Sequence, residues 1–106
     1  MRNIRLANYG DNFMFLEGLD RVVEQLVNDV PMGQSLRLDF EGVYIISPSY
    51  MTRLLDAIMV QLKPKNIALE NANTRIESTF NFAIHSIKLK NSDKKSNNSF
   101  QYVGEN

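Results

Sequence analysis

The sequence of 106 residues contains no cysteine, a single histidine, three prolines and five glycines. Without cysteine, the chain can form neither a disulfide nor a thiolate metal site. Its 12 basic and 12 acidic side chains give a formal net charge of zero, which argues against a general binder of nucleic acid or of membrane surfaces. No apolar run approaches the roughly 18 residues needed to span a bilayer. The N-terminal segment also lacks the apolar stretch of a signal peptide, so we expect a cytoplasmic protein.

The composition that remains is that of one ordinary globular domain. Hydrophobic residues make up 43% of the chain and charged residues 23%, and a chain of this length can bury one core. The charges are unevenly spread. Residues 1–62 carry five Arg against eight Asp and Glu, a net charge of −3, and residues 63–106 carry six Lys and one Arg against four acids, a net charge of +3. We interpret the lysines near the C-terminus as a solvating tail, and a phosphate or acidic-partner contact is the alternative.

Three segments with the pattern of strands alternate with three helical patterns. The strands are expected near residues 3–7, 35–46 and 66–70. The resulting βαβαβα order predicts an α/β fold in which helices pack on a small, mainly parallel sheet. Residues 1–88 would form this domain. Residues 89–106 would form a polar linker and tail, in which 100–103 returns as an edge strand, and a sheet edge or a helix face offers a route to a homodimer.

Each helix has its own start signal. The first is expected to be capped by Asp11 or Asn12, the second to run over residues 48–62, and the third to begin at a capping box of Thr74 and Glu77. The apolar stripe of the first helix recurs at intervals of three and four, and consists of Phe15, Leu16, Leu19, Val22, Val23, Leu26, Val27 and Val30. The apolar stripe expected for the second helix consists of Met51, Leu54, Leu55, Ile58, Met59 and Leu62. The third helix is expected to bury Ile76, Phe80, Ala83, Ile84 and Ile87.

The start of the second helix has two interpretations. Ser47 is well placed as its N-cap, and Pro48 as its first residue. Ser49 then falls in the first turn, where free backbone N–H groups and the positive end of the helix dipole favour an anion by about 0.3–1 kcal/mol. The serines either only start the helix, or Ser49 also accepts a phosphate or contacts a partner.

The segment LRLDFEGVYIISPSYMTRLLDAI, residues 36–58, resembles the central strand and following helix of STAS-like domains, which are similar to anti-sigma-factor antagonists. The shared features are a strand that ends in Asp, a Gly-Val pair, a short apolar run and a serine-rich turn that opens a helix. These residues are Asp39, Gly42, Val43, Ile45, Ile46, Ser47, Ser49 and Tyr50. The later segment IALENANTRIESTF resembles the third strand, Asn-containing turn and helix of the family, so the resemblance covers about residues 1–88.

The resemblance implies a non-enzymatic domain that regulates other proteins by binding them. Ser49 matches the phosphorylatable serine of the antagonists, and Ser47 stands in place of the Asp that usually precedes it. The chain departs from the family where Tyr50 replaces a Gly and where Met-Thr-Arg at residues 51–53 replaces acidic residues. Arg53 follows Ser49 by about one helical turn, so it would either hold a phosphate there or neutralise the helix face.

Other candidates for chemistry are few. Asp39 falls near the carboxyl end of a parallel strand, where open α/β sheets often place ligands, and we interpret it as an acceptor for loop amides, with catalysis as the alternative. His85 has the position of a solvated histidine on the third helix. Glu17, Asp20 and Glu24 form a solvated helix face, because no histidine or fourth ligand joins them. With no Walker loop, GxGxxG or Ser-His-Asp set present, we expect no enzyme, no cofactor and no metal.

The sequence therefore favours a regulatory protein–protein interaction module. Its binding surface would be the turn at residues 47–50 and the exposed face of the second helix, with Ser47, Ser49, Tyr50 and Arg53 as partner-binding or phosphorylation candidates. The partner that the resemblance implies is a histidine-kinase-like ATPase or another switch protein. From the composition, we expect neither a membrane nor nucleic acid as a partner. The alternative is a stand-alone inhibitor, for example a phage-encoded one, that blocks a host factor with the same scaffold, and a small enzyme is the third candidate.

Overall fold

The computed structural model describes residues 1–90 and 101–103. Its elements along the chain are β1 (Arg2–Arg5), the 3-10 turn η1 (Leu6–Asn8), α1 (Leu19–Asp29), β2 (Ser35–Asp39), α2 (Pro48–Leu62), β3 (Asn66–Glu70), α3 (Thr74–Lys90) and β4 (Gln101–Val103). The predicted α/β fold is confirmed, because β1, β2 and β3 form a parallel sheet and alternate with three helices in the order βαβαβα.

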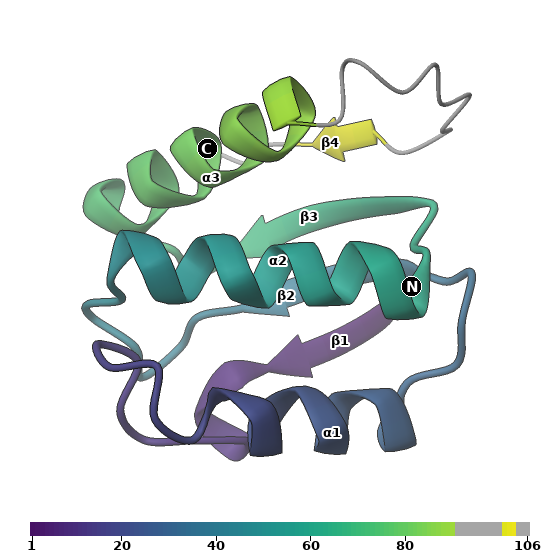
Figure 1. The fold of residues 1–106 in the computed structure, drawn as a ribbon, viewed down its shortest axis with the longest axis horizontal. Coiled ribbons are helices and arrows are strands. Elements are labelled where there is room, and N and C mark those ends of the chain that lie inside the picture. Colours follow the sequence, from purple (N-terminus) through teal and green to yellow (C-terminus); the bar gives the residue numbers. More distant parts are fainter. Residues whose placement is uncertain (91–100, 104–106) are drawn as a thin grey trace.

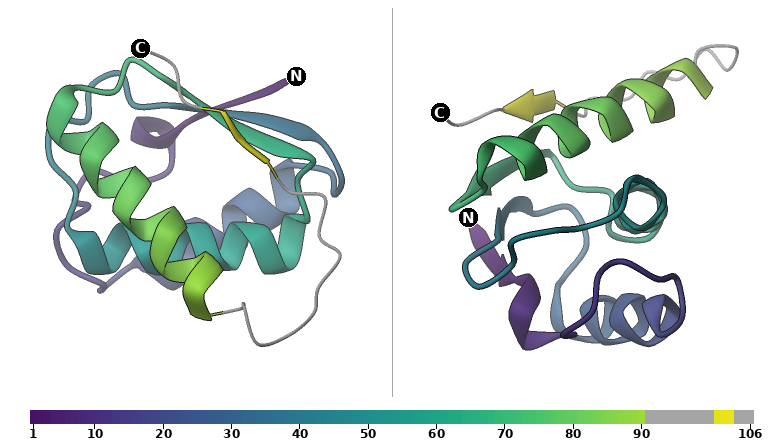
Figure 2. Two further views of the ribbon diagram at one scale, coloured as in Figure 1. Left: turned by 90° about the horizontal axis from the view of Figure 1, so that it is seen from above. Right: turned by 90° about the vertical axis from the view of Figure 1, so that its left-hand side faces the viewer.

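The strands lie in the order β1-β2-β3-β4, and every neighbouring pair is parallel. Right-handed crossovers between strands that follow one another in this order place each helix on the same face of the sheet. Figures 1 and 2 show the result, a layer of strands with α1, α2 and α3 all on one side of it. No described helix covers the opposite face of the sheet.

The core lies between the sheet and the helices. Alternate strand residues point toward the helices, and Ile4, Leu38 and Leu69 stand in register across β1, β2 and β3 with at most 2% of each exposed. Over them packs the predicted stripe of α2, in which Leu54 and Leu55 are fully buried. The stripe predicted for α3 is also buried, and consists of Ile76, Phe80, Ala83, Ile84 and Ile87.

The second strand is shorter than predicted, because it ends at Asp39 and not at residue 46. The Asp39 carboxylate accepts the backbone N–H of Glu41 at 2.9 Å, and Gly42 has a φ of 84°. Glycine adopts this left-handed conformation at little cost, so the chain turns out of the sheet here. The apolar residues after the strand are buried as parts of a packed loop, and these are Phe40, Val43 and Ile46.

The first helix begins at Leu19, so the start predicted at Asp11 or Asn12 is wrong. Asn12 stabilises only a local turn, because its side-chain oxygen accepts the N–H of Met14 at 3.0 Å. Gly18, with a φ of 90°, then leads the chain into the helix. Of the predicted stripe, the buried members are Leu19, Val22, Leu26 and Val30, and the exposed ones are Phe15, Leu16 and Val27.

The third helix starts one residue away from the predicted capping box. Asn73 caps it, because its side-chain oxygen accepts the N–H of Ile76 at 2.8 Å. Thr74 is therefore the first helical residue and not the cap. The helix continues to Lys90, into the segment predicted to be a linker.

The rest of the predicted tail is only partly described. Residues 91–100 and 104–106 lie outside the described residues, so the linker, and Phe100 as part of a returning strand, stay predictions. Residues 101–103 form β4, which pairs with β3 through Gln101 opposite Asn66. Within the described ranges, no helix is both long enough and apolar enough to cross a membrane.

Replacing Leu54 by Ala should lower the free energy of unfolding by about 2–5 kcal/mol, because a cavity is left between α2 and the sheet. The control is Val60→Ala on the same helix, where the side chain is 60% exposed, and it should change stability by less than about 0.5 kcal/mol. Urea denaturation measures both. A Leu54→Ala midpoint equal to that of the wild type would show that α2 does not pack as described.

Candidate functional site

The loops that follow β1, β2 and β3 meet at the carboxyl edge of the sheet, because parallel strands end on the same side (Figure 1). The backbone N–H of Ser47 donates to the carbonyl of Phe13 at 3.0 Å, which joins the first loop to the second. The side-chain amide of Asn73 donates to the carbonyl of Tyr44 at 3.2 Å, which joins the second loop to the third. Residues 9–18, 40–47 and 71–73 therefore form one connected surface.

The serine-rich turn starts α2 as predicted. Ser47 is the N-cap, its side-chain oxygen accepts the N–H of Tyr50 at 3.1 Å, and Pro48 is the first helical residue. Ser49 is exposed in the first turn of the helix, where backbone N–H groups have no partners within the helix. The Ser47 hydroxyl is thus engaged in the cap, whereas Ser49 is accessible from solvent.

Tyr50 is a core residue, which corrects its prediction as a partner contact. It is 1% exposed, and its ring packs edge to face against Phe13 with centroids 5.5 Å apart and an interplanar angle of 82°. Burial raises the pKa of the Tyr50 phenol above its ordinary value. Tyr50 precedes Leu54 by four residues and so shares its core-facing side of α2, which explains why a residue beside exposed Ser49 is nevertheless buried.

Arg53 lies on the outer side of α2. It contributes to two hollows beside that helix, one of about 450 Å³ against α1 and one of about 580 Å³ against α3. Its guanidinium makes no ion pair with another described residue. The structure therefore places Ser49 and Arg53 near the same end of α2, both exposed, and removes Tyr50 from that surface.

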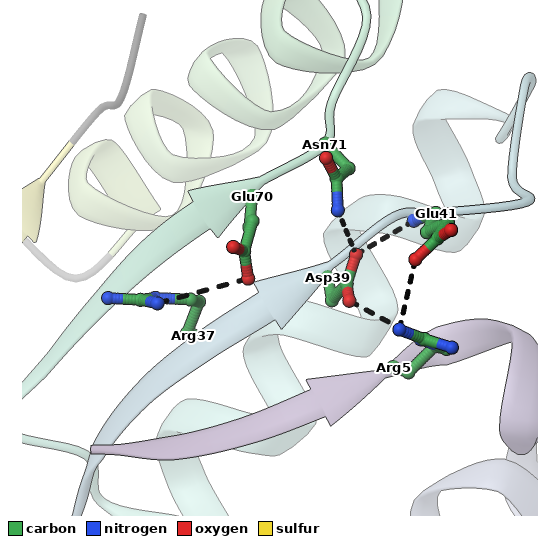
Figure 3. A network of polar contacts seen from close by, with 6 residues as sticks. All are labelled: Arg5, Arg37, Asp39, Glu41, Glu70 and Asn71. Carbon is green, nitrogen blue, oxygen red and sulfur yellow. Dashed lines mark hydrogen bonds and ion pairs between the residues drawn. The ribbon is translucent and has the colours of Figure 1, made fainter.

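Asp39 is buried at the end of β2, with 6% of its surface exposed. Its Oδ1 accepts the backbone N–H of Glu41 and the side-chain amide of Asn71, each at 2.9 Å. Its Oδ2 accepts Nε–H of Arg5 at 3.3 Å, while Nη2 of the same Arg5 reaches the Glu41 carboxylate at 2.9 Å (Figure 3). The carboxylate accepts loop amides, as predicted, and it also connects the ends of β1, β2 and β3.

The electrostatics of Asp39 follow from these contacts. Burial alone raises the pKa of its carboxyl, but the hydrogen bonds from Asn71, from the Glu41 backbone and from Arg5 outweigh burial and hold the pKa below its ordinary value. Asp39 is therefore a permanent anion at neutral pH. An anion that already accepts three donors is suited to holding loops in place.

Sequence reasoning missed an apolar surface at the same edge, which we call the loop patch and define as Met14, Phe15, Leu16, Tyr44 and Ile45. Phe15 is 67% exposed and Tyr44 is 77% exposed. Met14, Tyr44 and Ile45 also help to line a hollow of about 350 Å³ between the first two loops. Phe15 and Leu16 directly follow Met14 in the chain. Exposed apolar side chains that lie together, as Met14, Tyr44 and Ile45 do around this hollow, mark interaction sites more often than scattered ones do.

The sequence does not predict the loop patch, because the start predicted for the first helix and the end predicted for the second strand are both wrong. The periodicity predicts Phe15 and Leu16 in the buried stripe of the first helix, and Ile45 in the second strand. Gly18 and Gly42 are the residues in the sequence that argue against these boundaries. They have φ angles of 90° and 84°, a left-handed conformation that interrupts a helix or a strand. Once α1 starts at Leu19 and β2 ends at Asp39, these apolar residues belong to loops.

The open face of the sheet is polar. Arg5, Arg37 and Glu70 are each next in the chain to a core residue of their strand, so their side chains point to the face opposite the helices. Nη1 of Arg37 lies 3.9 Å from Oε1 of Glu70 (Figure 3). Parallel sheets normally have both faces covered by apolar packing, and these charges explain how one face of this sheet can stay uncovered. The strand order also has no reversal point, which is where open α/β sheets place their ligand crevices.

Acid should destabilise this protein partly through Asp39. Because its pKa is lowered by folding, the unfolded chain binds more protons in the acid range, so stability rises with pH there. The contribution is fully present above the unfolded-state pKa of about 3.9, and it is lost as the pH falls through the lower pKa of the folded state. Asp39→Asn should remove this dependence and lower stability at neutral pH by about 1–3 kcal/mol.

Urea titrations across the acid range measure the effect of Asp39. The control is Asp11→Asn, because Asp11 is an exposed carboxylate that makes no ion pair with the described residues, and its acid dependence should match that of the wild type. An acid dependence that survives Asp39→Asn unchanged would contradict the role given to this carboxylate.

Truncating Tyr50 should affect folding. Tyr50→Ala removes a ring that is 1% exposed, so it should lower the free energy of unfolding by about 3–5 kcal/mol. Tyr50→Phe keeps the ring against Phe13 and should cost about 1 kcal/mol or less. Thermal or urea denaturation separates the two variants, and a Tyr50→Ala protein as stable as the wild type would mean that this side chain is on the surface.

In comparisons with known proteins, no protein-family model, no curated protein and no solved structure matches this chain.

Proposed function

We propose that this protein is a non-enzymatic regulatory module of the STAS-like type, which binds another protein through the carboxyl edge of its sheet. The observation that carries the proposal is the loop patch, whose Phe15 and Tyr44 side chains are 67% and 77% exposed. Large aromatic side chains dominate the energetics of protein interfaces because they bury much area at small cost in conformational entropy. The binding surface predicted from sequence is therefore moved from Tyr50 to these neighbouring loops.

The rigidity of the edge supports this proposal. The Ser47–Phe13 hydrogen bond, the Phe13–Tyr50 ring contact and the Asn73–Tyr44 hydrogen bond hold both loops of the patch. A surface that is ordered before binding loses less entropy on association. Burial of Tyr50 thus contributes to binding indirectly, by fixing the loop that carries Phe13 beside the one that carries Tyr44.

Ser49 supports a phosphorylation-sensitive form of the same function. It is exposed at the first turn of α2, and a phosphate there would add about −1.5 to −2 charges at pH 7. The helix N-terminus tolerates an anion, and Arg53 lies about one turn further along the same helix. The partner would then be a histidine-kinase-like ATPase or another switch protein, as the resemblance implies.

The alternative function is a stand-alone inhibitor that covers a host factor. It is favoured by the loop patch itself, which consists of exposed apolar groups and needs no modification to bind. The two functions differ in what Ser49 does, because a switch depends on its charge and a plain inhibitor does not.

Phe15→Ser and Tyr44→Ser should each weaken binding to the partner at least tenfold, about 1.4 kcal/mol, if the loop patch is the interface. The matched control is Phe82→Ser on α3, because Phe82 is 62% exposed, close to the 67% of Phe15. Binding proteins captured from the host by the wild-type chain are identified by mass spectrometry, purified and titrated with each variant by calorimetry. Equal affinity of all three variants and the wild type would remove the loop patch from the interface.

The charge on Ser49 distinguishes a switch from an inhibitor. For a switch, Ser49→Asp should weaken partner binding at least tenfold, while Ser49→Ala should bind as the wild type does. Both substitutions lie at an exposed position, so circular dichroism should show unchanged folding. Wild-type affinity in both variants would exclude the switch and leave the inhibitor.

A further inference from the structure

Acidic residues lie in the loops of the patch, whereas the neighbouring basic residues lie in helices. Residues 9–18, 40–47 and 71–73 contain Asp11, Glu17 and Glu41, and no Lys or Arg. The basic residues that follow these loops are Arg21 of α1, Arg53 of α2 and Arg75 of α3. Asp11 helps to line the hollow between the loops together with Met14 and Tyr44. Glu17 directly follows Leu16 in the chain, and both are exposed.

The acidic charge around the patch is only partly neutralised. Arg5, the nearest basic residue before the first loop, is engaged with Asp39 and Glu41. Asp11 and Glu17 make no ion pair with any other described residue. Asp20, at the start of α1, instead lines the hollow between α1 and α2 together with Arg53. The apolar side chains are therefore accompanied by two exposed loop carboxylates whose charge is available to a partner.

We infer that the loop patch binds a protein segment that combines aliphatic or aromatic anchors with Lys or Arg. This inference rests on the proposed function and names the chemistry of its partner. Complementary charges steer association and select among partners, and exposed carboxylates repel both anionic membrane surfaces and nucleic acid. A basic, apolar peptide segment is the macromolecular ligand that satisfies both properties of this surface.

The hollow adds a constraint on the anchors. Its volume of about 350 Å³ is at the small end of the range of roughly 300–1,000 Å³ found for ligand pockets. Its wall includes Phe13 and Val43 beside the more exposed Met14 and Ile45. A space of this size and lining suits one or two apolar side chains of a segment that otherwise lies across the loops.

Selection from a library of random peptides displayed on phage tests this inference on the full chain without a known partner. The selected peptides should be enriched in Lys or Arg together with aliphatic or aromatic residues. Synthetic copies, followed by fluorescence anisotropy, should bind more weakly as the salt concentration rises. They should also bind about tenfold more weakly, or worse, to the variant that combines Asp11→Asn with Glu17→Gln, while the control Asp56→Asn on α2 should bind as the wild type does.

The possible failures are distinguishable. Selected peptides that are acidic or uncharged, and that lose binding to Phe15→Ser and Tyr44→Ser, would overturn the inference on charge and leave the proposed binding surface standing. Peptides that bind these two variants as well as the wild type but fail to bind Phe82→Ser would overturn both. A selection that yields no peptide above background would also contradict both.

Discussion

Asp39 is the last residue of β2 and is 6% exposed. Its carboxylate accepts hydrogen bonds from the Arg5 side chain, the Glu41 backbone and the Asn71 side chain. These donors belong to the ends of β1, β2 and β3, so a single side chain fixes how three consecutive strands leave the sheet. A buried anion is costly unless such donors compensate it. The loops beyond it can therefore be irregular and apolar at their surface, because their starting points are fixed.

At the same edge, neighbouring aromatic residues differ in burial. Tyr50 and Phe13 face inward and lock two loops together, whereas Phe15 and Tyr44, a few residues away, face solvent. Apolar residues exposed on loops lose the free energy that burial would provide. Their exposure on loops that tertiary hydrogen bonds hold in place is consistent with contacts made to a partner.

The sequence predicted most of the fold, because hydrophobic periodicity reports burial directly. The α2 stripe with Leu54 and Leu55, and the cap by Ser47, follow from local pattern and are as predicted. The loop patch was not predicted, because Phe15, Leu16 and Ile45 also fit the periods of the adjacent helix and strand. Only the left-handed turns at Gly18 and Gly42, together with tertiary hydrogen bonds, decide that they lie in loops. Tyr50 is predicted to be exposed because it follows Ser49 in the serine-rich turn. It is buried because it lies one helical turn before Leu54, on the side of α2 that faces the core.

Hydrogen–deuterium exchange of the full chain, with and without a bound protein partner, tests the central claim most directly. If the carboxyl edge is the binding surface, amide exchange should slow in residues 13–17 and 43–46 on binding, and exchange in α3 around Phe82 should not change. Slowing confined to the outer sides of α2 and α3, with the two loops unaffected, would contradict the claim.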